Sequence, residues 1–389
     1  MSVLYKKYDF EKLEFLMFVF DELADKLSSE GKDIIKLTLG KAQEPLHESI
    51  VDAWKDAVED PSKRNLVYPE GLPALRDKIV RWYTDWGTPV NRRSVLINTG
   101  TSPFFKDLFR LLIEDGDEIL LPQPYYSVYY ISGLLTSAKI KFYNVDPITL
   151  EIDMDDFKGK YNSYATKIVV MCSPGNPYGN VIADDVYREV MNITKARTFI
   201  VSDEIYRNTG FSGRVPSILE FADKNDMQRI IVTNSFSKGF RMYTARVGFS
   251  ILPDVLLEPM RVLLQHTLLT TNPCEQFACI EALNHLDEVE NLTEIYKSRN
   301  DYTVNAFKDI EDVRVISAEG GFYLVIDADN YMTLNNIENT HNLAKNILYE
   351  TGVAVVPGSD FGLVTGLRLS FTNLRYQEGI DRLVAYFSK

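Results

Sequence analysis

Short, β-branched apolar runs alternate with helical stretches between residues 49 and 285, and this alternation constrains the fold more than any other feature of the chain. The runs are VLIN (95–98), DEILLP (117–122), KIKFYNV (139–145), KIVVMC (167–172), TFIVSD (198–203) and RIIVTN (229–234). Strands that are apolar along their length and are separated by helices are typical of a mainly parallel sheet with both faces covered. The pattern therefore predicts an α/β fold with a helix-covered sheet.

The two ends of the chain follow a different pattern. Residues 10–29 have the periodicity of an amphipathic helix, and the run IIKLTL (34–39), which ends at Gly40, has the pattern of a strand. After about residue 285, a long charged helical stretch precedes the runs VRVI, GGFYLVI, VAVVP and GLRLSF, each bounded by turn residues. This mixture predicts a second, smaller α+β domain.

Charge and composition exclude several classes of protein. A formal net charge of -13 would repel a phosphodiester backbone, so we expect no nucleic-acid partner. The apolar run Phe15 to Phe20 is too short for a signal peptide or a membrane span, and no other run is long enough, so we expect a cytoplasmic protein without membrane contact. Three cysteines lack the spacing of a disulfide framework or a zinc site, which predicts buried thiols and no metal.

Polar residues follow several of the apolar runs, at the points where parallel strands would end. In an open α/β sheet, ligands bind outside the carboxyl ends of the strands. VLIN is followed by Gly100, Thr101 and Ser102 at the start of a helical stretch, whose free N–H groups could bind a phosphate. KIVVMC runs into SPGNPYGN, where Asn176 precedes a proline in a stretch rich in turn formers.

Charged residues follow the next two runs. TFIVSD ends at Asp203, and Tyr206 comes about one helical turn later. RIIVTN leads into SFSKGF, in which Lys238 stands beside two serines, and Arg246 follows eight residues after the lysine. Two hydroxyls, an amine and a guanidinium at one strand end indicate an anion site with an amine beside it. Each feature alone would be read as a helix cap or a solvated charge, so the hypothesis depends on their coincidence at four strand ends.

Five segments around these residues resemble the class I/II aminotransferases, which are pyridoxal-phosphate enzymes of fold type I. They are YPEGLPALR (68–76), SPGNPYG (173–179), SDEIY (202–206), SFSKGFRMYTARVG (235–248) and GLRLSF (366–371), and they occur in the order typical of the family. The resemblance spans nearly the whole chain. It implies a large domain at residues 48–285 that binds pyridoxal 5'-phosphate and a small domain built from residues 1–47 and 286–389.

The resemblance also implies roles for the residues at the strand ends. Lys238 would form the internal aldimine with the cofactor and then carry the proton at the substrate Cα. Asp203 would pair with the protonated ring nitrogen, because a buried carboxylate stabilises that charge. Asn176 and Tyr206 would hydrogen-bond the ring oxygen O3'.

Further residues of the resemblance would hold the phosphate and the ring. The phosphate group would be bound by Ser235, Ser237, Arg246 and the backbone of Gly100, Thr101 and Ser102. Tyr126 occupies the ring-stacking position, with Tyr125 close enough to compete for it. Tyr68 matches the residue that reaches the phosphate of a neighbouring subunit, which implies a homodimer with shared active sites.

The substrate side is specified less completely. Arg368, in GLRLSF, matches the arginine that grips the substrate α-carboxylate, with Asn176 and Gly40 nearby. Arg241 stands where the family has a small residue, and we expect it to be a surface arginine without a role in the site. No second arginine is evident for a dicarboxylate side chain, so the amino donor stays open.

The leading functional hypothesis is an aminotransferase that moves an amino group from an amino acid to a 2-oxo acid. The same machinery serves carbon–sulfur lyases, eliminating enzymes similar to aminocyclopropane-carboxylate synthases, and pyridoxal-phosphate oxidases, since all begin with a carbanion at Cα. A non-enzymatic sensor of the cofactor or of an amino acid is a further alternative. The absence of a basic helix-turn-helix pattern before residue 30 argues against that sensor.

Overall fold

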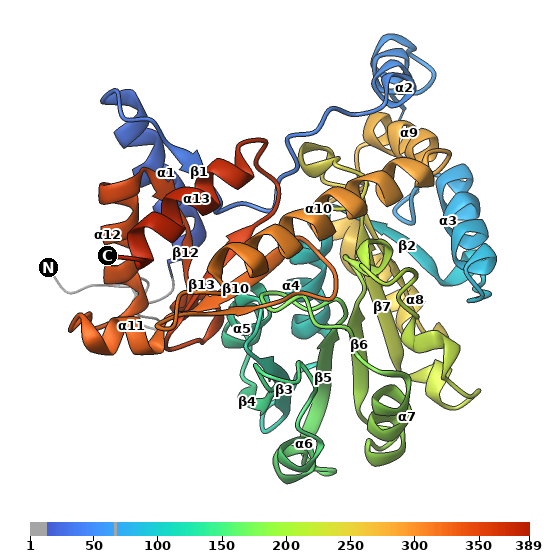
Figure 1. Ribbon diagram of the computed structural model, residues 1–389. Coiled ribbons are helices and arrows are strands. Elements are labelled where there is room, and N and C mark those ends of the chain that lie inside the picture. Colours follow the sequence, from blue (N-terminus) through green and yellow to red (C-terminus); the bar gives the residue numbers. More distant parts are fainter. Residues whose placement is uncertain (1–13, 66–67) are drawn as a thin grey trace, which may run out of the picture.

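A seven-stranded sheet forms the centre of the computed structural model, which describes residues 14–65 and 68–389 (Figure 1). Its strand order is β2-β8-β7-β6-β5-β3-β4, and within this sheet β8 alone runs antiparallel to its neighbours. The strands are β2 (Val95–Asn98), β3 (Glu118–Gln123), β4 (Lys139–Asn144), β5 (Thr166–Cys172), β6 (Phe199–Asp203), β7 (Ile230–Ser235) and β8 (Gly248–Ile251). Each of the six predicted runs forms one strand, so the predicted α/β class is confirmed.

Both faces of this sheet are buried, because successive side chains of a strand point to opposite sides. Val169 of β5 packs in one apolar cluster, whereas its neighbours Ile168 and Val170 pack in another. The helices of this part of the chain are α2 (Glu48–Glu59), α3 (Pro73–Asp85), α4 (Thr101–Leu112), α5 (Ser127–Leu134), α6 (Met154–Lys160), α7 (Asp184–Ile193), α8 (Asp254–Thr267) and α9 (Pro273–Ala282). Continuous apolar runs without polar alternation are thus explained by helices on either side of the sheet.

The two chain ends pack together beside this sheet. A two-stranded parallel sheet joins β1 (Ile35–Lys36) to β11 (Val353–Ala354). An antiparallel sheet of order β12-β13-β10-β9 contains β9 (Arg314–Ile316), β10 (Tyr323–Asp327), β12 (Val356–Pro357) and β13 (Gly366–Ser370). The surrounding helices are α1 (Leu16–Ser29), α10 (Leu286–Phe307), α11 (Asp329–Leu334), α12 (Thr340–Thr351) and α13 (Tyr376–Phe387). One apolar cluster spans both ends, with Phe20 and Leu27 packed among residues 292–387; the exact domain boundaries stay a prediction.

Three details of the predicted elements need correction. The first helix begins at Leu16, because the backbone of Phe15 is extended. Residues 10–13 of the predicted helix lie outside the described residues. The run IIKLTL pairs as a strand only at Ile35 and Lys36. Beyond them the Leu37 carbonyl accepts the Ser370 backbone N–H, and the carbonyls of Thr38 and Leu39 accept hydrogen bonds from side chains. The sequence reading also missed β8, which is short and directly follows the lysine motif.

The remaining elements of the described residues are six short 3-10 turns: η2 (Arg92–Ser94), η3 (Arg207–Thr209), η4 (Ile218–Glu220), η5 (Asp226–Gln228), η6 (Tyr243–Ala245) and η7 (Gly358–Phe361). Within residues 14–65 and 68–389, no helix has the length and apolar character that a bilayer crossing requires. The three cysteines are buried free thiols, as predicted.

Candidate active site

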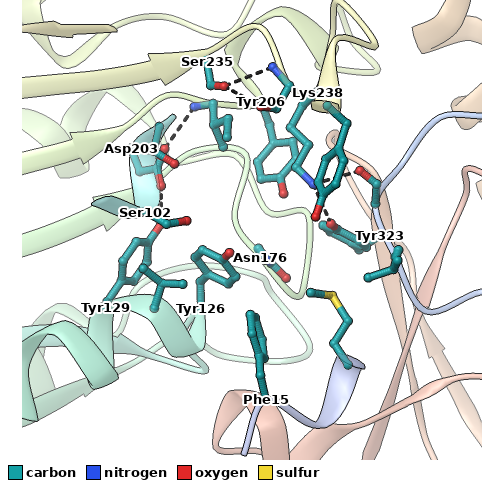
Figure 2. Close-up of a pocket in the computed structure, with 18 of the residues that line it drawn as sticks. Phe15, Ser102, Tyr126, Tyr129, Asn176, Asp203, Tyr206, Ser235, Lys238 and Tyr323 are labelled. Atoms are coloured by element: carbon teal, nitrogen blue, oxygen red, sulfur yellow. Dashed lines mark hydrogen bonds between the residues drawn. The ribbon is translucent and has the colours of Figure 1, made fainter. Parts of the chain in front are cut away.

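A cavity of about 250 Å³ lies where the carboxyl ends of the central strands meet residues from both chain ends (Figure 2). Twelve of the fourteen predicted site residues line it: Gly40, Thr101, Ser102, Tyr126, Asn176, Asp203, Tyr206, Ser235, Ser237, Lys238, Arg246 and Arg368. Gly100 lies just behind Arg246, and Tyr68 lies outside the cavity. The structure therefore brings the residues at the predicted strand ends together around one cavity.

Lys238 stands three residues after the end of β7 and extends across the cavity. Its Nζ atom donates a hydrogen bond to the Gly40 carbonyl oxygen at 2.9 Å and lies 3.3 Å from the Tyr323 hydroxyl. A Cβ atom at Gly40 would lie 1.9 Å from that hydroxyl and 2.9 Å from Nζ, so a side chain cannot be accommodated there. Glycine at this position is thus required above all by the close approach of the Tyr323 ring.

Asp203 is the last residue of β6 and is 2% exposed. One carboxylate oxygen accepts a hydrogen bond from the Tyr129 hydroxyl at 2.6 Å, and the other accepts one from the Ile205 backbone N–H at 3.2 Å. Burial raises the pKa of Asp203 to about 6, against the opposing effect of these hydrogen bonds. The described residues place no cation in salt-bridge contact with it, so the carboxylate is oriented but not neutralised by the protein.

One end of the cavity combines hydroxyls, a guanidinium and a helix terminus. The Ser235 and Ser237 hydroxyls lie 2.9 Å apart, and Arg246 approaches Ser237 at 3.4 Å. Gly100 caps α4 with φ +79°, and a Cβ atom there would lie 2.8 Å from the Arg246 guanidinium. The free N–H groups of the first turn of α4, beginning at Thr101, add the positive end of the helix dipole. This donor set is the kind that binds a phosphate group.

Arg368, on β13, is 1% exposed and forms a second anion site. Its guanidinium donates to the Asn176 side-chain oxygen at 3.2 Å and to the Thr38 carbonyl at 2.7 Å, and it lies 4.0 Å from the ring centre of Tyr323 and 4.5 Å from that of Phe361. Its Nε atom has no hydrogen-bond partner, and no described carboxylate lies in salt-bridge contact with it. A buried cation without a counter-charge is costly, so this position suits a bound carboxylate.

Two tyrosines in the site were missed by the sequence reading. Tyr129 holds Asp203, and Tyr323 lies between Lys238 and Arg368. Burial acts to raise the pKa of the Tyr323 phenol, but the charges of Lys238 and Arg368, with hydrogen bonds from Tyr206 and Lys238, lower it to about 8. Position 323 lies in the apolar run GGFYLVI, where a tyrosine looks like a core residue; its place at the start of β10, beside two glycines, was the available signal.

Two uncertain aromatic assignments can now be placed. Tyr126 lines the cavity, whereas Tyr125 stacks on Tyr130 and Phe142 with ring centres 5.3 and 5.1 Å away. Tyr126 is therefore the better placed of the two neighbouring tyrosines to stack on a bound ring. Tyr68, which was expected to reach a neighbouring subunit, is 76% exposed.

Arg241 is not the solvated surface residue that the sequence suggested. Its side chain is 8% exposed and forms an ion pair of 2.6 Å with Glu288 in the first turn of α10. The backbone at Arg241 is left-handed, with φ +59°, which turns the chain after Lys238. Arg241 thus links the lysine turn to α10, outside the cavity.

A family comparison agrees with this geometry. The model of the class I and II aminotransferases matches residues 32–387. The chain belongs to the class I and II aminotransferases. Members of this family use pyridoxal phosphate, and this aminotransferase is a transferase that acts on an amino acid and an oxo acid.

Individual relatives cover nearly the whole chain. An asparagine–oxo-acid transaminase of Streptococcus mutans is 25% identical over 378 residues, which is 94% of each chain. An aspartate aminotransferase of Bacillus sp. (strain YM-2) is 26% identical over 374 residues, covering 92% of this chain and 93% of the relative. The crystal structure of an aspartate aminotransferase from Thermotoga maritima superposes with a TM-score of 0.85 at 25% identity, covering 96% of this chain and 97% of that one.

The residues of the cavity fit pyridoxal phosphate. The described lining holds three cations, Lys238, Arg246 and Arg368, but a single acid, Asp203. A phosphate group and a substrate carboxylate would balance the two arginines, and a protonated ring nitrogen would balance Asp203. The Gly100 contact leaves room for a phosphate beside Arg246, where any other residue would intrude.

Proposed function

We propose that this aminotransferase transfers the amino group of an amino acid to a 2-oxo acid, with Lys238 as the residue that binds the cofactor covalently. The observation that carries the proposal is the position of the Lys238 amine, inside the cavity and in contact with Gly40 from the opposite chain end. When bound, pyridoxal phosphate supplies an electron sink for the carbanion that forms at the substrate Cα.

Lys238 has two tasks in this proposal. It first holds the cofactor, and once the incoming amino acid releases it, its free amine takes the proton from the substrate Cα and later returns it. The Gly40 carbonyl and the Tyr323 hydroxyl hold the amine in position, so little reorganisation is needed between these steps. A lysine suits both tasks because its primary amine can bind a carbonyl carbon covalently and, once released, act as a base.

Asp203 would keep the ring nitrogen protonated. The Tyr129 hydrogen bond fixes the carboxylate orientation, and a cation at this point would remove the burial penalty that raises the pKa of Asp203. Asn176 and Tyr206 would donate to the ring oxygen, and Tyr126 would stack on the ring. These assignments are supported by the shared cavity of the side chains.

The two anion sites divide the remaining work. We assign the phosphate to Ser235, Ser237, Arg246 and the turn from Gly100 to Ser102, and the substrate α-carboxylate to Arg368. Arg368 is rigidly held between two aromatic rings, so its guanidinium can orient the substrate without losing side-chain entropy. This orientation aims the Cα proton at Lys238.

We also propose a homodimer in which Tyr68 reaches the phosphate of the neighbouring subunit. Tyr68 projects from its own chain with 76% of its surface exposed, beside Leu269, which is 66% exposed. The Tyr68 carbonyl accepts a hydrogen bond from Thr270, which ties these two segments together. Large exposed apolar side chains on one surface favour an interface between copies.

The decisive experiment uses the purified protein loaded with pyridoxal phosphate. We expect borohydride to fix one cofactor per chain at Lys238, and Lys238→Ala to lower the rate by at least about 10³-fold. An amino acid alone should convert the cofactor to its amino form, and 2-oxoglutarate should then yield glutamate. Release of ammonia, pyruvate or peroxide without an acceptor would instead indicate a lyase, an eliminating enzyme or an oxidase.

A further inference from the structure

The function proposed above gives a role to each cation in the described lining of the cavity. Arg246 faces the phosphate site, Lys238 the reacting carbon and Arg368 the α-carboxylate, and the described lining contains no fourth cation. A donor with a second carboxylate would therefore bring a negative charge into a space where the described lining of this chain offers no counter-charge. Burying an unpaired carboxylate is strongly unfavourable.

The wall opposite the strand ends is apolar. Phe15, Met17 and Phe18, from the start of α1, line the cavity together with Leu39 and Val128. Phe15 packs edge-on against Phe18, with ring centres 5.4 Å apart, and lies 6.1 Å from Tyr126. Figure 2 shows Phe15 across the cavity from Ser235 and Lys238. A substrate side chain directed away from Lys238 thus meets aromatic and aliphatic carbon.

This wall is shared with a larger cavity of about 660 Å³. The two cavities have Phe15, Ser102 and Val128 in common, and the larger one continues along Tyr130 and Ile131 of α5. Its volume exceeds what a small side chain would fill, so the space can take a ring or a long aliphatic chain.

The charges around the larger cavity also disfavour a second carboxylate. Asp360 of η7 is 7% exposed; one of its oxygens accepts the Leu16 backbone N–H at 3.0 Å, and the other has no partner. Burial lowers the pKa of His341, which disfavours the charged imidazolium. Lys106 also borders this cavity, but it is exposed on α4, where attraction between solvated charges is weak.

We propose, on the basis of the transaminase function above, that the amino donor is a neutral amino acid with a large apolar or aromatic side chain. That side chain lies against Phe15 and Val128, on the side of the site that the larger cavity borders. Such a donor differs from the aspartate and asparagine named for two of the relatives.

The first test compares donors in the half-reaction of the loaded enzyme. L-Phenylalanine and L-leucine should give a kcat/KM at least roughly tenfold above those of L-aspartate and L-alanine, since apolar contact area favours them and a second carboxylate is penalised. A kcat/KM for aspartate equal to or above that of phenylalanine would overturn the proposal. The assay uses the native assembly, so any residue contributed by a partner copy is included.

The second test does not depend on turnover. Binding of the unreactive 3-phenylpropionate and of succinate is measured by calorimetry on the loaded protein, and the former should bind at least tenfold more tightly. If no donor reacts yet 3-phenylpropionate is preferred, the transfer reaction is wrong and the apolar site stands. Tighter binding of succinate would refute the apolar site whatever the reaction.

Two variants locate the selectivity within the cavity. Phe15→Ala should lower kcat/KM for phenylalanine about tenfold with little change for alanine, whereas Tyr164→Ala, at an 85% exposed tyrosine, should change neither. Lys106→Met should leave the ratio of phenylalanine to aspartate unchanged. If the parent instead used aspartate as well as phenylalanine, and Lys106→Met lowered only the aspartate activity, the cavity beside Lys106 would be assigned to the side chain of a dicarboxylate.

Discussion

The two sides of the cavity are built in different ways. On the strand-end side, Asp203, Ser235 and Lys238 lie within short polar segments that directly follow buried strands. On the chain-end side, Phe15, Gly40 and Arg368 come from segments that are far apart in the sequence and largely apolar. In the proposed function, the first side carries the groups for cofactor chemistry, and the second covers and orients the substrate.

The contacts between the two sides show why both are needed. Lys238 bonds the carbonyl of a residue 198 positions earlier in the chain, and Arg368 bonds one 330 positions earlier. A change on the strand-end side should therefore remove chemistry, whereas a change on the chain-end side should alter substrate binding and the position of the lysine. Three substitutions test this division.

Asp203→Asn, on the strand-end side, should have the largest effect. An amide cannot hold a proton on the ring nitrogen by charge, so kcat should fall by roughly 10³-fold while cofactor remains bound through Lys238. Rapid-mixing measurement of the half-reaction gives kcat, and dialysis against buffer gives retention of the cofactor. A loss of less than about fivefold would contradict the assigned role.

The same substitution has an effect on stability with the opposite sign. In the cofactor-free protein the pKa of Asp203 is about 6, above its ordinary value of 3.8, so the folded state binds more protons and its stability falls as pH rises through this window. At ~1.4 kcal/mol per pH unit, the loss approaches about 3 kcal/mol by pH 7. Urea unfolding should show that Asp203→Asn lacks this loss; an identical pH dependence in both proteins would argue against it.

Arg368→Lys, on the chain-end side, should act mainly on substrate binding. Lysine keeps the charge but loses the planar pair of donors, so kcat/KM for the amino acid should fall about 10²-fold, with KM carrying most of the change. Steady-state kinetics with a fixed oxo acid measure both parameters. Asp203→Asn should instead lower kcat. If the two variants changed kcat and KM in the same proportions, the distinction between the two sides would be wrong.

The strand-end side could be predicted because its information is local. Parallel strands end at the same edge of a sheet, so Asn176, Asp203 and Lys238 had to lie close together once the runs before them were read as strands. The sheet order and the antiparallel β8 could not be read in the same way, since strand pairing depends on contacts between distant segments. The four-residue run of β8 carries too little pattern of its own.

The chain-end side could be predicted only in part. The resemblance supplied Gly40 and Arg368, and the structure gives a physical reason for each. The Tyr323 ring leaves no space for a side chain at position 40, and the buried Arg368 guanidinium has an Nε atom without a partner. The sequence did not indicate that Phe15 and Tyr323 line the site, because aromatic residues in apolar runs are ordinary core residues. The prediction that Arg241 is a surface residue was wrong. Its partner Glu288 is 47 residues away, so no local pattern indicates the ion pair.

Tyr323→Phe should give the smallest of the three effects and tests the junction between the two sides. The phenol contacts Lys238 at 3.3 Å, so its loss should lower kcat about tenfold by freeing the amine to move.

In the cofactor-free protein, the charges of Lys238 and Arg368 overcome burial and lower the pKa of Tyr323 to about 8, below its ordinary value of 10.0. Its ionisation therefore stabilises the fold above about pH 10, and this contribution is lost as pH falls through 8, so the pH-dependent part of the stability difference between parent and variant should be absent at pH 7. An ultraviolet titration should show one tyrosine ionising near pH 8 in the parent and in Tyr164→Phe, but not in Tyr323→Phe; persistence of that step in Tyr323→Phe would assign it to another group and detach Tyr323 from Lys238.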